Sequence, residues 1–187
     1  MKWSTRILQI GVSCVLLTTV LLAQKQIFVP ANDASFRIST DQSSYRAGDK
    51  ITLKYRITNT SYAPLYVPRE WEVTCPRGPH VWAWFEDSSG KHFVPGYGIS
   101  CSGNPRSIIE RISKEAVLLK PREHFDGTFP LDSKLFDLKP GAYRIEATLS
   151  GWTDEKFSDA ERSQLAQMGG RFMTGDVPDS VRIQLTQ

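Results

Sequence analysis

The chain has few of the residues on which catalytic and metal sites usually depend. Its 187 residues include only three cysteines and three histidines. No cysteine lies within a few residues of another, and no His-Glu-x-x-His pattern occurs. The segment most similar to the Gly-x-Ser-x-Gly nucleophile elbow of hydrolases, residues 98–102, has Ser in place of the second Gly. The sequence therefore predicts no catalytic residue, no metal and no cofactor.

An excess of charge of one sign is also lacking, because 23 basic side chains stand against 20 acidic ones. No cluster of Lys and Arg with interleaved aromatic residues occurs, so we expect no nucleic-acid partner. The long apolar run extends from Ile7 to Ala23 and follows Lys2 and Arg6. It is short for a bilayer span of about 20 residues and ends in a small residue. This pattern predicts a signal peptide over residues 1–23.

Export to the periplasm or the extracellular space follows from that prediction. The alternative is an uncleaved anchor formed by residues 7–23, and we expect membrane association only in that case. Cleavage after Ala23 would remove Lys2 and Arg6, which lowers the number of basic side chains from 23 to 21 against 20 acidic ones. The mature part of the chain is then almost neutral.

Cleavage would also remove Cys14 and leave the pair Cys75 and Cys101. We predict a disulfide between them, because an oxidising compartment permits the bond. Closing a loop of this length should stabilise the fold by roughly 3–4 kcal/mol. Two reduced thiols are the alternative.

A tight turn followed by a strictly alternating strand gives the clearest signal of fold. Leu138, Pro140 and Gly141 form the turn, and Tyr143 begins a strand whose Ile145, Ala147 and Leu149 share its face. In immunoglobulin-like sandwiches a Tyr at this corner sends its hydroxyl to upstream backbone. We therefore predict a structural corner made by Leu138, Pro140, Gly141 and Tyr143.

The rest of the chain supplies further strands of the same period. We expect a flexible leader over residues 24–34 and a short helix from Ser158, with a capping box to Glu161, in an insertion at about 151–178. Pro64 and Pro68 predict an edge or irregular strand between them. The other predicted strands cover residues 35–40, 51–57, 80–86, 91–94, 108–112 leading into 116–119, 124–131 and 179–185.

These patterns predict an all-β fold. The specific expectation is one immunoglobulin-like antiparallel sandwich over residues 35–187, with about 7–9 strands and a short helix before the last strand. Such a length is sufficient for a single domain with its own core.

The order of signals resembles a known group of domains. Tyr45-Arg-Ala-Gly48-Asp49, Val81-Trp82-Ala-Trp84, Leu119-Lys-Pro121 and Leu138-Lys-Pro140-Gly141-Ala-Tyr143 are similar to bacterial exported immunoglobulin-like or fibronectin-III-like domains. The layout over residues 35–150 is also similar to the family of the Bacillus intracellular proteinase inhibitor. The resemblance implies a β-sandwich and, from the second family, a loop presented to a protease. The Cys75–Cys101 segment and the helical insertion depart from that layout.

Aromatic residues supply the functional hypothesis. Trp82 and Trp84 share one face of a predicted strand whose other face is also apolar, so they are either covered by another element or open to solvent. If they are open, Trp82, Trp84, Tyr97 and Trp152 form a candidate contact surface for an exported protein or a glycan. We therefore predict a non-catalytic interaction module. A protease inhibitor and a carbohydrate-binding module are the alternatives.

Overall fold

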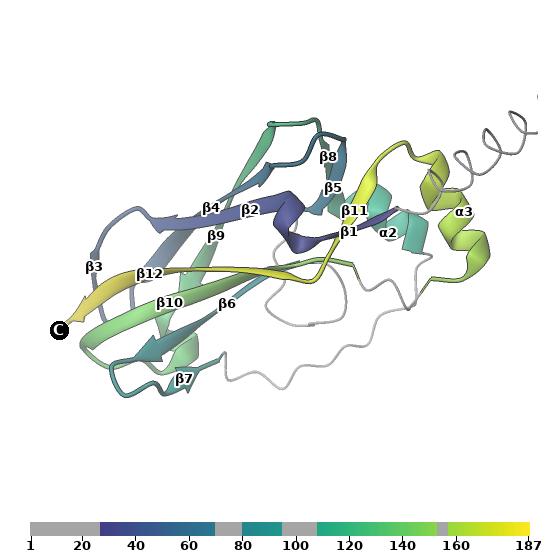
Figure 1. Cartoon of the computed structure of the whole chain (residues 1–187). Coiled ribbons are helices and arrows are strands. Elements are labelled where there is room, and N and C mark those ends of the chain that lie inside the picture. Colours follow the sequence, from purple (N-terminus) through teal and green to yellow (C-terminus); the bar gives the residue numbers. More distant parts are fainter. Residues whose placement is uncertain (1–26, 70–79, 95–107, 153–156) are drawn as a thin grey trace, which may run out of the picture.

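The structure, a computed structural model, describes residues 27–69, 80–94, 108–152 and 157–187. These residues form mostly strands, arranged in three sheets with two short α-helices (Figure 1). The prediction of a β-rich chain is thus confirmed. The elements are β1 (Phe28–Pro30), η1 (Ala31–Asp33), β2 (Ala34–Thr40), β3 (Ser44–Arg46), β4 (Lys50–Asn59), β5 (Leu65–Pro68), β6 (His80–Asp87), β7 (His92–Phe93), α2 (Ile108–Glu115), β8 (Ala116–Leu119), β9 (His124–Asp132), η2 (Ser133–Phe136), β10 (Gly141–Ser150), α3 (Asp159–Gln167), β11 (Arg171–Thr174) and β12 (Asp176–Thr186).

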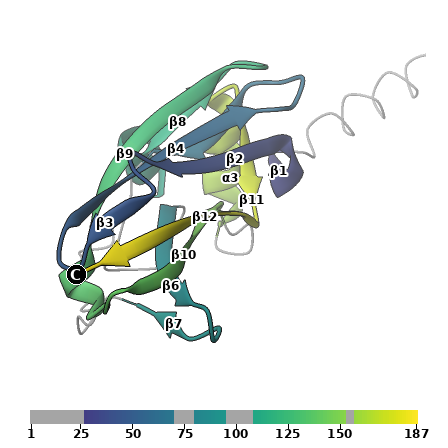
Figure 2. The same cartoon turned by 90° about the vertical axis from the view of Figure 1, so that its left-hand side faces the viewer.

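Two of the sheets face each other. A three-stranded sheet has the order β2-β4-β9, and a five-stranded sheet has the order β3-β12-β10-β6-β7. Figure 2 shows β2, β4 and β9 above β12, β10, β6 and β7. Along one side the sheets are joined by a hydrogen bond of 2.8 Å, which the backbone N–H of Ile38 on β2 donates to the Asp179 carboxylate on β12.

The main core lies between these two sheets because their strands alternate apolar and polar side chains. Every second residue of β4 and β10 is buried, and the residues of β6 with the same orientation are buried as well. The buried side chains contributed by these three strands are Ile51, Leu53, Tyr55 and Ile57, then Tyr143, Ile145, Ala147 and Leu149, and Val81, Ala83 and Phe85.

A third sheet and the two helices form a second, smaller core at one end of the molecule. This four-stranded sheet has the order β1-β11-β5-β8. Leu165 of α3, Ile112 of α2 and Phe172 of β11 are buried together with Trp152 and Phe157. The predicted helix is therefore confirmed as α3, whose Ser158 and Glu161 form the capping box. The insertion adds its own hydrophobic cluster to the fold.

The prediction of a flexible leader over residues 24–34 is wrong for its last seven residues. Phe28–Pro30 forms β1, which pairs in parallel with β11, and Ala31–Asp33 forms a 3-10 turn. Val29 is buried in the main core. The segment is ordered because β11, 144 positions away in register, supplies the backbone partner, and neither short strand shows enough alternation to be recognised.

The predicted strand at residues 108–112 is also wrong, because Ile108–Glu115 is the helix α2. Ile112 is buried in the second core, while Glu110 and Lys114 are exposed and form an ion pair of 2.8 Å. A spacing of four between charged partners and a separate apolar face are typical of a helix. The strand expected at 116–119 is present as β8.

The segment between Pro64 and Pro68 is not an edge strand. It forms β5, which lies inside the four-stranded sheet between β11 and β8. Pro64 precedes the strand and Pro68 is its last residue, so the intervening residues still provide backbone N–H groups. The rule that excludes proline from central strands therefore does not apply to residues at the strand ends.

Candidate functional site

Trp82 and Trp84 lie on the outer face of the five-stranded sheet. Their strand β6 directs Val81, Ala83 and Phe85 into the main core, so the alternate residues point away from it. Both tryptophans are half-buried rather than fully exposed or fully covered. They therefore present part of their indole surface to solvent on a strand that pairs with β10 at both tryptophans and with β7 only at Phe85 and Glu86.

The two indoles pack against each other. Their ring centroids are 4.5 Å apart and the ring planes are inclined by 33°. Trp82 donates a hydrogen bond of 3.1 Å from Nε1 to the Ser150 hydroxyl on β10. The Nε1 atom of Trp84 is buried and has no hydrogen-bond partner among the described residues, and its ring centroid lies 6.1 Å from that of His92.

Charged side chains adjoin the indoles in the register of β6 and β10. Trp84 is opposite Glu146, and Glu86 is opposite Arg144. The Arg144 guanidinium contacts Glu86 at 2.9 Å and Glu146 at 2.6 Å. The hydrogen bond with Glu86, and then the charges of Glu146 and Glu86, raise the pKa of Arg144. We call Trp82, Trp84, Glu86, Arg144 and Glu146 the tryptophan face.

The charges of the tryptophan face are close to balanced. The Arg144 side chain is 44% exposed, whereas those of Glu86 and Glu146 are 19% and 17% exposed. Arg182 of β12 is exposed and stands opposite Arg144 in register. The result is an apolar centre with a polar border of both signs, which is the anatomy of protein contact surfaces.

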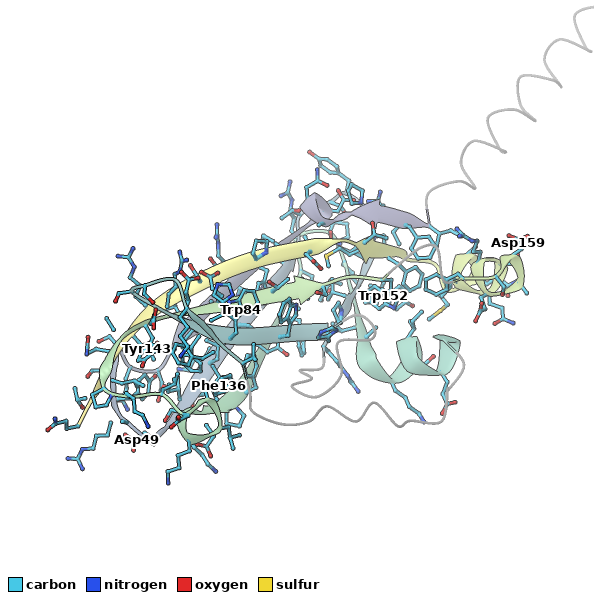
Figure 3. The ribbon with its side chains drawn as sticks, turned by 90° about the horizontal axis from the view of Figure 1, so that it is seen from below. Asp49, Trp84, Phe136, Tyr143, Trp152 and Asp159 are labelled. Atoms are coloured by element: carbon cyan, nitrogen blue, oxygen red, sulfur yellow. The ribbon has the colours of Figure 1, made fainter. Side chains whose placement is uncertain are left out.

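Trp152 does not belong to this surface. It is only 2% exposed and packs in the second core, where its ring meets Phe172 edge-on with centroids 5.4 Å apart. Figure 3 shows Trp152 toward Asp159 of α3 and well away from Trp84. The contact surface expected from sequence is therefore corrected to exclude Trp152, and Tyr97 lies outside the described residues.

Tyr143 makes the kind of backbone contact expected for the corner. Its hydroxyl donates a hydrogen bond of 2.9 Å to the Lys139 carbonyl and accepts one of 3.2 Å from the Lys139 N–H. Its ring meets Phe85 and Phe93 edge-on, and Phe136 packs on Phe85, near Tyr143 in Figure 3. The contacts of this cluster are packing and backbone hydrogen bonds.

The three histidines are not assembled into a site. His80 is buried on β6, His92 lies 3.4 Å from Glu86, and His124 lies 3.7 Å from Asp126 on the other sheet. Among the described residues no group of three His, Cys, Asp or Glu side chains is placed to hold a metal ion.

Several expectations concern segments outside the described residues. These are the signal peptide of residues 1–23, the Cys75–Cys101 disulfide, and a predicted loop over residues 96–105, which is the other candidate contact surface of the interaction module. In the part of the chain that the structure describes, no helix has the length and apolar character needed to cross a bilayer.

Sequence reasoning identified the two tryptophans but missed their charged neighbours. Glu86 is four residues before Gly90 of the hairpin, and Arg144 and Glu146 alternate with the apolar residues of β10. The outward direction of all three was readable from this alternation. Their proximity was not, because the pairing of β6 with β10 joins segments about 60 residues apart.

Comparison with known protein families finds no match, and comparison with curated proteins finds none. Among solved structures, the chain is similar to the C-terminal domain of Wzt, with a TM-score of 0.42 and 10% identity over 83% of this chain and 74% of that chain. It is also similar to β-glucosidases from Erythrobacter marinus (TM-score 0.39, 17% identity) and Listeria innocua (0.40, 13%). In both cases 82% of this chain matches 16% of the enzyme. The chain thus spans a small part of these glucosidases, and the likenesses are too weak to support a function.

Proposed function

We propose that the chain is a non-catalytic, exported binding module that contacts another protein through the tryptophan face. The observation that carries the proposal is the half-buried, tilted pair of Trp82 and Trp84, bordered by the Glu86–Arg144–Glu146 ion pairs, on the outer face of a sheet. Trp and Arg are enriched among the residues that dominate the energy of protein interfaces. The pairing of β6 with β10 and the contact between the two rings hold both indoles in place, which reduces the entropy lost on binding.

The scaffold in this proposal is an immunoglobulin-like sandwich. Two facing sheets with a shared core and the hydrogen bond from Tyr143 to the Lys139 carbonyl support it. The export part of the proposal rests on the apolar run of residues 7–23 and includes a disulfide between Cys75 and Cys101. In such a fold the sheets serve as a rigid platform and the activity depends on what their surfaces contact.

The mutual stacking of the indoles favours a protein partner over a sugar. A sugar platform requires indole faces that lie open, side by side, to successive rings. With centroids 4.5 Å apart and ring planes inclined by 33°, Trp82 and Trp84 pack against each other instead of lying side by side in one plane. The exposed part of the two indoles is a compact apolar patch with charged neighbours. A partner side chain can pack against such a patch.

Affinity capture with matched variants tests the proposal. The mature domain, Trp84→Ser and Lys54→Ser would be immobilised and exposed to secreted or periplasmic proteins, and each retained protein would be purified for titration. Lys54 is an exposed residue of β4 and provides the control on the other sheet. We expect Trp84→Ser to weaken binding by roughly 30-fold or more, because central interface residues cost about 2 kcal/mol or more on truncation. Lys54→Ser should bind like the unmodified domain.

A second variant, Glu146→Lys, keeps both indoles and reverses one charge of the tryptophan face. It should weaken the same partner, while thermal unfolding verifies that each variant is folded. A purified partner whose affinity is unchanged in both Trp84→Ser and Glu146→Lys would contradict the proposal. Glycan binding that depends on Trp84, without a protein partner, would replace it with the carbohydrate-binding alternative.

A further inference from the structure

A buried asparagine joins two turns at the end of the molecule that holds the β4–β5 and β8–β9 connections. Asn59 donates from Nδ2 to the carbonyls of Ala63 and Leu119, at 2.8 and 2.9 Å. Its backbone N–H donates to the Glu123 carbonyl and its carbonyl accepts from the Arg122 N–H, both at 3.0 Å. Residues 60–64 and 120–123 are therefore held as one unit, and Figure 1 shows the two connections side by side at the top of the view.

The unit presents an aromatic ring and a cation to solvent. Tyr62 is 89% exposed, which is the largest exposure among the large hydrophobic side chains of the described residues. The Arg122 guanidinium lies over its ring, with Cζ 5.7 Å from the centroid. No ion pair involves Arg122 or the neighbouring exposed Lys120 among the described residues, and the Glu123 carboxylate accepts a hydrogen bond from the Lys120 backbone N–H. The tip thus carries two unpaired cations and one carboxylate bound to its own turn.

The backbone of Arg122 is in the left-handed region, with φ of 68°. Residues other than glycine are uncommon in this region, and glycine would adopt this conformation at lower energetic cost. The Asn59 hydrogen bonds keep the turn in place despite that cost. The fold therefore holds a guanidinium at a position where the backbone alone favours glycine.

We propose that Tyr62 and Arg122, with Lys120, form a second contact surface that binds a carboxylate-rich protein segment. The guanidinium can take a carboxylate in a bidentate pair while the Tyr ring packs on the partner's apolar stems. A rigid turn with an exposed Tyr and Arg resembles the anchors of loop-based binding surfaces, in which little ordering entropy is lost. This surface is independent of the tryptophan face and would remain if that proposal failed.

NMR titration of the folded mature domain tests the inference. The probes are three ten-residue peptides of glutamate, glutamine and lysine, observed through the backbone amides of residues 60–64 and 119–123. We expect saturable shifts at these amides with the glutamate peptide only. The shifts should weaken as salt is raised, because salt screens the attraction between solvent-exposed charges.

Two variants separate binding from folding. Arg122→Gly removes the guanidinium but suits a positive φ, so the domain should unfold at the same or a higher temperature and lose the response. Tyr62→Ser removes an exposed ring and should leave stability unchanged while weakening binding by about tenfold. Lys54→Ser should retain the response of the unmodified domain.

The inference would be overturned by an absent response to the glutamate peptide or by equal responses to the glutamate and glutamine peptides. A response that persists in Arg122→Gly would overturn it as well. Binding of phosphatidylglycerol vesicles through these residues, without any response to the glutamate peptide, would replace the protein partner with a lipid surface.

Discussion

Two polar side chains that bond to the backbone fix opposite ends of the facing sheets. Tyr143 ties its strand to Lys139, and Asn59 ties the ends of β4 and β8 together. The bond from Asn59 to the Leu119 carbonyl is buried and the bond from Tyr143 to the Lys139 carbonyl is partly buried, so each is worth more than an exposed hydrogen bond. Trp84 is the contrasting case, because its indole N–H has no partner among the described residues. The position of the Trp84 ring therefore depends on its contacts with Trp82 and His92 and not on a hydrogen bond of its indole N–H.

We predict that Tyr143→Phe lowers the free energy of unfolding by about 1–2 kcal/mol. The substitution keeps the ring and its edge-on contacts with Phe85 and Phe93 but removes the hydroxyl that bonds to Lys139. Urea unfolding at equilibrium measures the change. An unfolding midpoint equal to that of the unmodified domain would contradict the structural role of the corner.

We predict a larger effect for Asn59→Asp, about 3 kcal/mol of lost stability. A carboxylate cannot donate, so its oxygen would face the carbonyls of Ala63 and Leu119 in place of the amide nitrogen. Thr58→Ser, on the adjacent half-buried residue, is the matched control and should change little. Denaturant unfolding of both variants checks the difference, and equal midpoints would show that the amide network is not required.

Among the elements, sequence periodicity predicted those strands that are long enough to alternate. β4 and β10 were predicted to within a few residues because each places four apolar residues on one face. The parallel pair β1 and β11 was missed because its strands have only three and four residues and pair with strands that are distant in the sequence. α2 was missed because a short apolar run was interpreted as a strand, although Ile108, Ile109 and Ile112 have helical spacing.

The candidate site was predictable only in part for the same reason. The alternation of β6 places Trp82 and Trp84 on one face, and this could be read from the residues alone. Their stacking, the ion pairs of Arg144 and the burial of Trp152 depend on tertiary pairing between β6, β10 and the insertion. Local pattern gives the direction of a side chain, whereas long-range register decides its neighbours.

We predict that Ser158→Ala loosens α3 selectively. Ser158 accepts from the Glu161 N–H, and the Glu161 carboxylate accepts from the Ser158 N–H and hydroxyl. Removing the cap should cost about 1 kcal/mol. Hydrogen exchange should become faster in Asp159–Gln167 while β10 keeps its protection. Uniform acceleration across both elements would show that α3 and the main core open as one unit instead.

At the scale of the whole molecule, the ion pairs and hydrogen bonds of its surface carboxylates set the expected response to acid. The Arg56 hydrogen bond lowers the pKa of Asp126, the Lys139 hydrogen bond lowers that of Asp137, and the Ser158 hydrogen bond lowers that of Glu161. A carboxyl with a lowered folded-state pKa contributes stability above its ordinary value, which is 3.8 for Asp and 4.5 for Glu. That contribution is lost as the pH falls through the lowered pKa.

We therefore predict that stability is nearly constant from about pH 8 to pH 5 and decreases below about pH 4. The decrease is small for each group because these carboxylates are exposed and screened by solvent. Thermal unfolding across this range measures it, and Asp126→Asn should reduce the slope on the acid side. An unfolding temperature that rises as the pH is lowered from 5 to 3 would contradict the predicted loss of stability in acid.

Different parts of the molecule have different roles in these proposals. The second core, formed by α2, α3 and the four-stranded sheet, has a structural role, and Trp152 is one of its buried side chains. The outer face of the five-stranded sheet presents Trp82 and Trp84, and the turn unit of Tyr62 and Arg122 carries the second contact surface that we propose. The central claim is that the indole pair on β6 remains accessible in the folded protein.

Acrylamide quenching of tryptophan fluorescence tests this claim most directly. It would be measured on the folded mature domain and on Trp82→Phe, Trp84→Phe and Trp152→Phe. We predict that replacing Trp82 or Trp84 removes a readily quenched component, whereas replacing Trp152 removes a protected one. If Trp82 and Trp84 are as protected as Trp152, the tryptophan face is covered and is not a contact surface.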